Sequence, residues 1–348
     1  MIEEAVTGGG FADQEPPESW VAEGSAIRRA LVADFAAVPG VVVVEPLDAR
    51  YLDHRPRPTN VARIVTDRDH PIDRALLMGL VDAAVVVAPE EDGSLSSLAW
   101  LFEEYGLPSL GATRSAILLC SDKAALARFF ERVGIPSPPT RTFRRGEGLP
   151  AIPTDSGRVV IKPVWGEGAV DTFVLDAATR QLPPSWRRRT GLIQPYRSGP
   201  ACSASFLIDR GGRAHLIAVG RQTIEVGAAG AVRYAGGEIP IACSEADLIP
   251  LRRAVESIPG LLGFVGVDFV RSEPTGAVEV IEINPRVTTS IVGLVRLAPP
   301  GTIARAWLTC LLEPGGDDLG PDFAAIRSAP PVRFQADGTI RSTPEAAS

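Results

Sequence analysis

The stretch from Gly263 to Arg286 constrains the fold more than any other part of the chain, because it combines a hairpin pattern with charges that a hairpin does not need. Two runs rich in Val, Ile and Phe flank a Pro-Thr-Gly sequence at 274–276. These three residue types favour a turn, and the flanking runs favour strands. The sequence therefore predicts two antiparallel strands with the turn centred near Thr275.

The charges of this hairpin point to a metal site. Asp268 on the first strand lies about opposite Glu282, and Glu282 shares a strand face with Asn284 by the period of two. Two facing carboxylates repel unless one is protonated or a cation lies between them. Oxygen ligands suit Mg²⁺ or Mn²⁺, and Mg²⁺ usually shares its sites with substrate phosphates. We therefore predict that Asp268, Glu282 and Asn284 bind the metal and that Arg286 clamps an anion. The alternative is an ordinary hairpin whose acids face water.

Lysine is rare in this chain, since Lys123 and Lys162 are the only lysines among its 35 basic residues. A chain that otherwise uses arginine suggests that these two positions need a compact ammonium group, which triphosphate oxygens accept well. Lys123 lies at a predicted helix start, and Lys162 ends an apolar strand before a loop that contains Gly166 and Gly168. We predict that these four residues bind phosphate groups. The alternative is that both lysines are ordinary surface charges.

Three further residues extend the predicted nucleotide site. Gln194 and Tyr196 follow a strand and could present polar groups to an adenine edge, with Tyr196 as the amide donor because Pro195 has none. Arg221 follows another strand and could hold a phosphate or form a surface ion pair. The acidic sequence at 89–93 follows an apolar strand, where open α/β sheets bind ligands, although a solvated turn explains it equally well.

Composition limits the classes of function. The length of 348 residues predicts about two domains. The net charge of -7 and the pI near 5.2 argue against nucleic acid as a partner. No apolar run is long enough to span a bilayer, and the acidic start lacks an apolar signal region. The four cysteines have no paired metal spacing, which predicts free thiols in a reducing cytoplasm.

Residue periodicity predicts the order of the elements. In the first third, apolar strands alternate with helices, including helices at 18–37 and 71–81, and this alternation implies a small parallel sheet. A short helix is expected at 291–297. Residues 315–348 are rich in Gly, Pro and Asp and should be partly disordered, with one strand near 331–335.

Taken together, these residues resemble the ATP-grasp superfamily. The most specific match is the run Ile281–Arg286, and the other matching residues follow the order of the family along the chain. The resemblance implies the ATP-grasp fold, of α/β and α+β class, in which two lobes grip ATP and Mg²⁺. It places a pre-ATP-grasp α/β domain at 1–112, the N-terminal lobe at 113–196, the C-terminal lobe at 197–314 and an extension at 315–348.

The resemblance also implies an activity. Enzymes of this family activate a carboxylate as an acyl phosphate, which a nitrogen nucleophile then attacks, and the match assigns Arg286 and Arg221 as catalytic residues. The regions at 7–11 and 59–62 are similar to the branch that contains tyramine–L-glutamate ligase, of the methanofuran pathway. That branch implies small-molecule substrates, namely glutamate and tyramine or a related aromatic amine. Dimers are common in the superfamily, so a homodimer is expected.

The sequence departs from the family pattern in two places and leaves two alternatives open. Trp165 and Glu167 interrupt a loop that is usually rich in small residues, and Gln194 stands where an acidic residue is common. The first alternative is another ATP-grasp chemistry, such as a carboxylase or a peptide ligase. The second is a nucleotide-binding module without catalysis, against which the intact metal-binding set argues.

Overall fold

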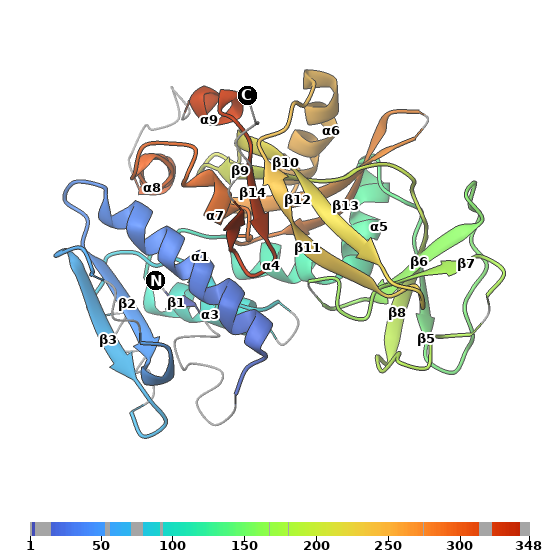
Figure 1. Ribbon diagram of the computed structural model, residues 1–348, viewed down its shortest axis with the longest axis horizontal. Helices are drawn as coiled ribbons and strands as arrows, with labels where there is room; N and C mark the ends of the chain where they lie inside the picture. Colours follow the sequence, from blue (N-terminus) through green and yellow to red (C-terminus); the bar gives the residue numbers. More distant parts are fainter. Residues whose placement is uncertain are drawn as a thin grey trace, which may run out of the picture.

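The computed structural model describes residues 2–3, 15–52, 56–70, 79–90, 93–166, 168–179, 181–273, 275–312 and 322–341 of the chain. Figure 1 shows an N-terminal α/β part in blue and a small sheet in green at the opposite end, with a large sheet between them. The glycine-rich stretch at 7–11 and most of the helix expected at 71–81 lie outside the described residues.

The N-terminal part combines helices with short parallel strands. Its helices are α1 (Glu18–Ala36), the single-turn η1 (Ala49–Tyr51) and α3 (Ser94–Tyr105). Its strands are β1 (Ile2–Glu3), β2 (Val43–Asp48), β3 (Val61–Thr66) and β4 (Val86–Val87). Strand β2 pairs with β3 and β1 pairs with β4, both in parallel. The prediction of parallel strands is confirmed, but the described strands form two separate pairs.

A buried ion cluster holds the N-terminal part together. Glu45 on β2 is 0% exposed and pairs with Arg28 of α1. Its second partner is Arg63 of β3, whose Nη2 lies 2.7 Å from a carboxylate oxygen of Glu45. The helix and both strands are therefore fixed around one carboxylate whose charge is neutralised by two guanidinium groups.

The small sheet is antiparallel, with the strand order β5-β8-β6-β7. Its strands are β5 (Arg141–Arg144), β6 (Arg158–Pro163), β7 (Phe173–Asp176) and β8 (Thr190–Pro195). One face of this sheet buries Phe143 and Ile161 around Trp186. Gly191 is required here, because a Cβ at this position would lie 2.5 Å from the ring of Phe143. The tight packing gives this sheet its own small core.

The large sheet has seven strands in the order β13-β12-β9-β10-β11-β14-β15, and all neighbours are antiparallel. The strands are β9 (Ala201–Ile208), β10 (Ala214–Val226), β11 (Val232–Ile239), β12 (Gly263–Ser272), β13 (Ala277–Asn284), β14 (Val332–Gln335) and β15 (Ile340–Arg341). The strand expected near 331–335 is confirmed as β14. The predicted C-terminal extension therefore contributes two strands to this sheet.

Helices cover both faces of the large sheet. Helices α4 (Arg114–Ser121), α5 (Lys123–Val133) and α6 (Glu245–Glu256) pack on one face. Helices α1, α7 (Ile291–Leu294), α8 (Thr302–Leu312) and α9 (Ala324–Ser328) pack on the other. The helix expected at 291–297 is thus a single turn. Strand β9 shows the alternation, since Phe206 enters the first core and Leu207 the second.

Two contacts bear on the predicted domain boundaries. Helix α5, whose first residue is Lys123, packs on the large sheet, although it lies within the predicted N-terminal lobe of 113–196. Asp34 of α1 accepts hydrogen bonds from the backbone N–H groups of Gly301 (2.6 Å) and Ala304 (2.7 Å), where α8 begins. The N-terminal part is therefore joined to the large sheet through buried hydrogen bonds as well as apolar packing.

Candidate active site

The predicted facing of the two carboxylates is confirmed. Strands β12 and β13 pair Asp268 directly with Glu282, and a bulge follows at once, so that Phe269 pairs with Val280. Val267 and Phe269 point into the apolar core on one face, whereas Asp268 points to the other face. The strand period thus separates the core side chains of this hairpin from its charged ones.

Asp268 is surrounded by polar groups. Asn284 Nδ2 donates to Asp268 Oδ2 at 3.1 Å, and Gln222 Nε2 donates to Asp268 Oδ1 at 2.9 Å. Burial, together with the charge of Glu282, raises the pKa of Asp268 to about 7, against hydrogen bonds from Asn284 and Ser203 that lower it. Sequence reasoning missed Gln222 and Ser203. The strand period could have placed these two side chains on the face of Asp268, but only with the knowledge that β9 and β10 lie next to β12.

Both lysines reach the second carboxylate. Lys123 Nζ lies 3.2 Å from Glu282 Oε2, and Lys162 Nζ lies 3.8 Å from the same oxygen. Lys162 is 6% exposed, and burial lowers its pKa to about 8. Burial alone would raise the pKa of Glu282, but the two ammonium groups outweigh it and hold the pKa below its ordinary value. The two lysines and the two carboxylates thus form one buried cluster.

The glycine-bearing loop is tied to this cluster through Lys123. Asp122 caps α5 by accepting from the backbone N–H groups of Ala124 and Ala125, which fixes the helix start where Lys123 lies. From there Lys123 Nζ donates to the carbonyl oxygen of Gly166 at 2.6 Å. Gly168 adopts a φ of 62°, in the left-handed region that favours glycine. The loop is therefore held against Lys123.

A cavity of about 540 Å³ opens beside the cluster, between the small and the large sheet. All predicted site residues contribute to its lining: Lys123, Lys162, Gly166, Gly168, Gln194, Tyr196, Arg221, Asp268, Glu282, Asn284 and Arg286. The structure therefore brings together residues that are up to 163 positions apart in the sequence.

The strand end at 194–196 differs from the expectation. The amide of Tyr196, predicted to face a ligand, donates instead to the carbonyl oxygen of Arg158 at 3.0 Å. The guanidinium of Arg158 also lies over the Tyr196 ring, 4.3 Å from its centroid. Gln194 is buried and donates to Thr140 Oγ1 at 2.9 Å. Tyr196 thus borders the cavity without a spare amide donor, because strand pairing with β6 uses that amide.

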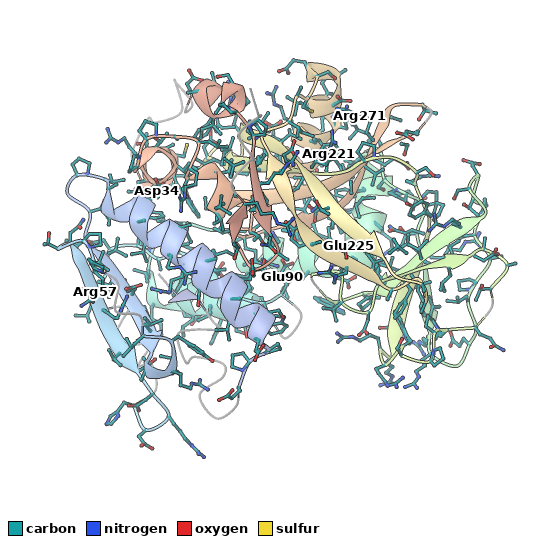
Figure 2. The ribbon with its side chains drawn as sticks, viewed as in Figure 1. Asp34, Arg57, Glu90, Arg221, Glu225 and Arg271 are labelled. Carbon is teal, nitrogen blue, oxygen red and sulfur yellow. The ribbon has the colours of Figure 1, made fainter. Side chains whose placement is uncertain are left out.

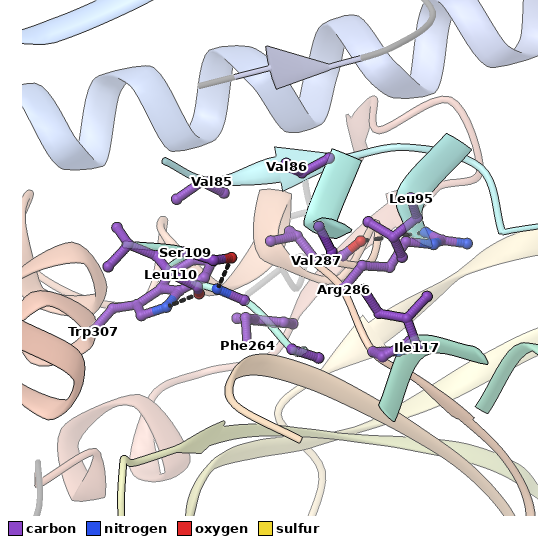
Figure 3. A pocket seen from close by; sticks show the side chains of 14 residues that line it. Val85, Val86, Leu95, Ser109, Leu110, Ile117, Phe264, Arg286, Val287 and Trp307 are labelled. Carbon is purple, nitrogen blue, oxygen red and sulfur yellow. Dashed lines mark hydrogen bonds between the residues drawn. The ribbon is translucent and has the colours of Figure 1, made fainter. Parts of the chain in front are cut away.

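Arg286 is held by an acidic residue of the N-terminal part. Arg286 Nε lies 3.0 Å from Glu90 Oε1, and Ser121 Oγ donates to Glu90 Oε2 at 3.2 Å. Figure 3 shows Arg286 between Leu95 and Val287, where the N-terminal part meets the large sheet.

 In that view, Leu95 of α3 and Val287 flank the Arg286 side chain, and both line the small apolar cavity there. The first acid of the 89–93 sequence is therefore a buried partner of Arg286, while Glu91 and Asp92 lie outside the described residues.

Arg221 lines the cavity, but its side chain does not join the carboxylates. Strand pairing sets Arg221 opposite Cys202, whose side chain enters the core on the α6 face of the large sheet. The neighbouring residue Gln222 is the one that reaches Asp268. Figure 2 shows Arg221 near Arg271, and both guanidinium groups act to lower the pKa of Cys202 against the larger effect of burial. Because side chains alternate along a strand, Gln222 faces the carboxylates and Arg221 faces the other side of the sheet.

The donor set fits a hard divalent cation. In the described part of the chain, no three His, Cys, Asp or Glu side chains gather into a metal cage. The site offers instead the carboxylates of Asp268 and Glu282, with the side-chain oxygen of Asn284, whose nitrogen already donates to Asp268. Two carboxylates with one amide oxygen match Mg²⁺, which completes its shell with water and phosphate oxygens. A cation between the two acids would also relieve the repulsion that raises the pKa of Asp268.

Comparison with known proteins agrees with this geometry. Residues 120–290 match the family model of the ATP-grasp domain. Tyramine–L-glutamate ligase of Methanocaldococcus fervens is 28% identical over 216 residues, which cover 62% of this chain and 62% of that protein. The protein of the same name from Methanocaldococcus jannaschii is 26% identical over 280 residues, or 78% of each chain. The first match therefore spans less than two thirds of the relative.

Solved structures show the same fold. An ATP-grasp superfamily protein from Archaeoglobus fulgidus has a TM-score of 0.59 and 23% identity, and the match covers 84% of this chain and 85% of that one. L-amino acid ligase from Bacillus licheniformis has a TM-score of 0.51 and 18% identity, with coverage of 69% and 59%. The predicted ATP-grasp fold is thus confirmed. Within the described residues, no helix has the length and apolar character needed to cross a membrane.

Proposed function

We propose that this chain, which belongs to the ATP-grasp superfamily through its domain at residues 120–290, is an ATP-dependent ligase that joins a carboxylate to an amine. The observation that carries the proposal is the convergence of two ammonium groups and two carboxylates beside one cavity. Lys162 comes from the small sheet and Glu282 from the large one, with 3.8 Å between Nζ and Oε2. This arrangement supports a nucleotide held between two lobes.

The lysines are suited to exchange partners when a nucleotide binds. Lys123 and Lys162 now neutralise Glu282. A divalent cation held by Asp268, Glu282 and Asn284 would supply positive charge that polarises phosphate oxygens. The two ammonium groups could then turn from the carboxylate to the phosphates, and neither buried charge would be left without a partner. Gly166 and Gly168 would close over the phosphates from the small sheet.

The proposed reaction has two steps that balance. A carboxylate oxygen of the acid forms a bond to the terminal phosphorus of ATP, and ADP leaves with the electrons of the broken P–O bond. The amine nitrogen then forms a bond to the acyl carbon, phosphate leaves with the electrons of the C–O bond, and the amine proton passes to water. Arg286, held by Glu90 at 3.0 Å, would neutralise the anionic oxygens. We assign no phosphate to Arg221, because strand pairing turns its side chain to the face of β10 opposite the carboxylates.

The relatives support a choice of substrates. Both curated relatives are named for tyramine and L-glutamate, so we propose glutamate as the acid and tyramine or a related aromatic amine as the nucleophile, in the methanofuran pathway. A cytoplasmic location agrees with the four cysteines, which are all free thiols. A homodimer stays a prediction, and size-exclusion chromatography with light scattering would decide it.

The direct test incubates the purified chain with ATP, Mg²⁺, glutamate and tyramine, and measures ADP and the amide product. Release of ADP that needs both the acid and the amine supports the proposal. Release with bicarbonate in place of the acid would favour a carboxylase instead. ATP binding without ADP release, across a panel of acids and amines, would favour a nucleotide-binding module and contradict the ligase.

A further inference from the structure

A carboxylate from the N-terminal part lines the cavity. Glu23 on α1 lines the cavity, and in the described part of the chain it is the one lining residue that precedes Lys123. Its carboxylate accepts a hydrogen bond from Thr289 Oγ1, in the turn that follows Arg286. The metal and phosphate groups of the proposed mechanism make no use of Glu23. It therefore needs a separate explanation.

Tyr234 shares the cavity with this carboxylate and with Asp268. The Tyr234 side chain lines the same cavity from β11. Burial raises the pKa of its hydroxyl, and the negative charges of Glu23 and Asp268 raise it further, so the phenol stays protonated. Glu23, Tyr234 and Asp268 thus line the same cavity.

Two apolar side chains line the same cavity as Glu23. Ile239 at the end of β11 and Phe334 of β14 both line the cavity. They pack against Gly293 of α7, where a Cβ would lie 2.8 Å from Ile239 Cγ2 and 3.4 Å from Phe334 Cδ1. The C-terminal strand therefore supplies part of a hydrophobic surface next to a carboxylate. An ammonium group attached to an apolar body would match both features.

We propose that Glu23 binds an ammonium group of the substrate, and that Phe334 contacts the apolar body that carries it. This inference rests on the ligase function proposed above. A half-buried carboxylate attracts a cation more strongly than an exposed one, because less water screens it. The ammonium could belong to the amine nucleophile or be the α-ammonium of an amino acid substrate. The apolar wall favours the amine.

The test compares tyramine with hydroxylamine as the nucleophile. Hydroxylamine is small and uncharged at neutral pH, so it can trap an acyl phosphate as a hydroxamate without an ammonium site. For Glu23→Gln, the ratio of kcat/KM for tyramine to kcat/KM for hydroxylamine should fall by about 10- to 100-fold, the usual effect of losing a hydrogen bond to a charged group. The amide oxygen of the new side chain can still accept from Thr289.

Thr289→Val is the matched control. It removes the hydrogen bond to Glu23 but keeps the charge, so the same ratio should stay within about threefold of the wild-type value. If Glu23 served only to join the N-terminal part to the large sheet, both variants would lower thermal stability and leave the ratio unchanged. Phe334→Leu provides a second variant that keeps the pocket apolar. It should raise KM for tyramine more than KM for ethylamine.

A second comparison, between glutamate and glutarate, shows whether the ammonium group belongs to the amine or to the amino acid. If Glu23 binds the α-ammonium of glutamate, Glu23→Gln raises KM for glutamate in the hydroxylamine assay but leaves KM for glutarate unchanged. If neither the nucleophile ratio nor KM for glutamate changes, and Phe334→Leu does not discriminate the amines, the inference is wrong. If wild-type protein forms no hydroxamate with any acid, the proposed function fails instead.

Discussion

Two glutamates in this molecule, Glu45 and Glu282, have similar partners and different surroundings. Glu45 in the N-terminal part lies between the guanidinium groups of Arg28 and Arg63. Glu282 in the large sheet lies near two ammonium groups, with Lys162 Nζ at 3.8 Å. Glu45 is 0% exposed, whereas Glu282 borders a cavity of about 540 Å³. The first cluster is enclosed by protein, and the second is open to a ligand.

The difference shows what distinguishes a candidate site from a structural ion pair. Arginine holds Glu45 through planar, directional hydrogen bonds, which suits a permanent contact. Around Glu282 the basic groups are lysines, a second carboxylate stands opposite, and the pKa values of Asp268 and Lys162 are shifted to about 7 and about 8. Buried charge alone therefore does not indicate function. Charge that is imperfectly balanced beside open space does.

The largest expected effect is on stability, at the enclosed cluster. Glu45→Ala leaves Arg28 and Arg63 buried without their shared carboxylate, so the free energy of unfolding should fall by about 3–5 kcal/mol. Urea denaturation, followed by circular dichroism, measures this change. The folded fraction should keep the KM for ATP of the wild type.

The matched control is an exposed ion pair. Glu245 and Arg252 lie 3.4 Å apart on α6, with 78% and 40% of their side chains exposed, so Glu245→Gln should cost less than about 1 kcal/mol. Equal losses in Glu45→Ala and Glu245→Gln would contradict the view that the enclosed cluster holds the N-terminal part together.

The next effect is on catalysis, at the open cluster. Lys162→Met removes a buried ammonium group that would neutralise phosphate oxygens, so kcat/KM for ATP should fall by about 10²- to 10³-fold. Thermal stability should change little or rise, because burial already disfavours this charge. Lys162→Arg keeps the charge but not the compact shape, so its kcat/KM for ATP should exceed that of Lys162→Met by less than about tenfold. Full activity in Lys162→Met would remove the lysine from the nucleotide site.

Much of this open cluster could be predicted from the sequence. The facing of Asp268 and Glu282 follows from a turn position and the period of two, and the two lysines stood out because the chain otherwise uses arginine. These signals are local or compositional. They do not depend on which strands become neighbours.

The remaining site residues depend on pairings between distant segments, which no local pattern specifies. Gln222 reaches Asp268 only because β10, β9 and β12 are adjacent in that order, and the same register turns Arg221 away. Glu90 contacts Arg286 across 196 positions. The Tyr196 amide binds the carbonyl oxygen of Arg158 on another strand, and the sequence does not show that these two segments pair.

A smaller effect is expected where the hairpin meets β10. Gln222→Leu removes the hydrogen bond to Asp268 Oδ1 but retains the size of the side chain, so the concentration of Mg²⁺ needed for half-maximal activity should rise by about tenfold. Arg221→Leu is the control on the opposite face of the same strand. If Arg221→Leu had the larger effect, the assignment of Gln222 in place of Arg221 would be wrong.

The smallest effect concerns pH, and it separates the two glutamate clusters most directly. Burial raises the pKa of Asp268 to about 7, so at pH 6 the Asp268 carboxyl group is protonated in most molecules and must release its proton before a divalent cation can bind between Asp268 and Glu282. Affinity for Mn²⁺, measured by isothermal titration calorimetry without nucleotide, should therefore rise by about fivefold between pH 6 and pH 7 and level off above pH 8. Asp268→Asn should bind weakly and lose this slope, whereas Glu45→Gln should keep it. A flat profile in the wild type would mean that Asp268 is ionised throughout this range, and that the repulsion between the two facing acids is relieved by the lysines alone.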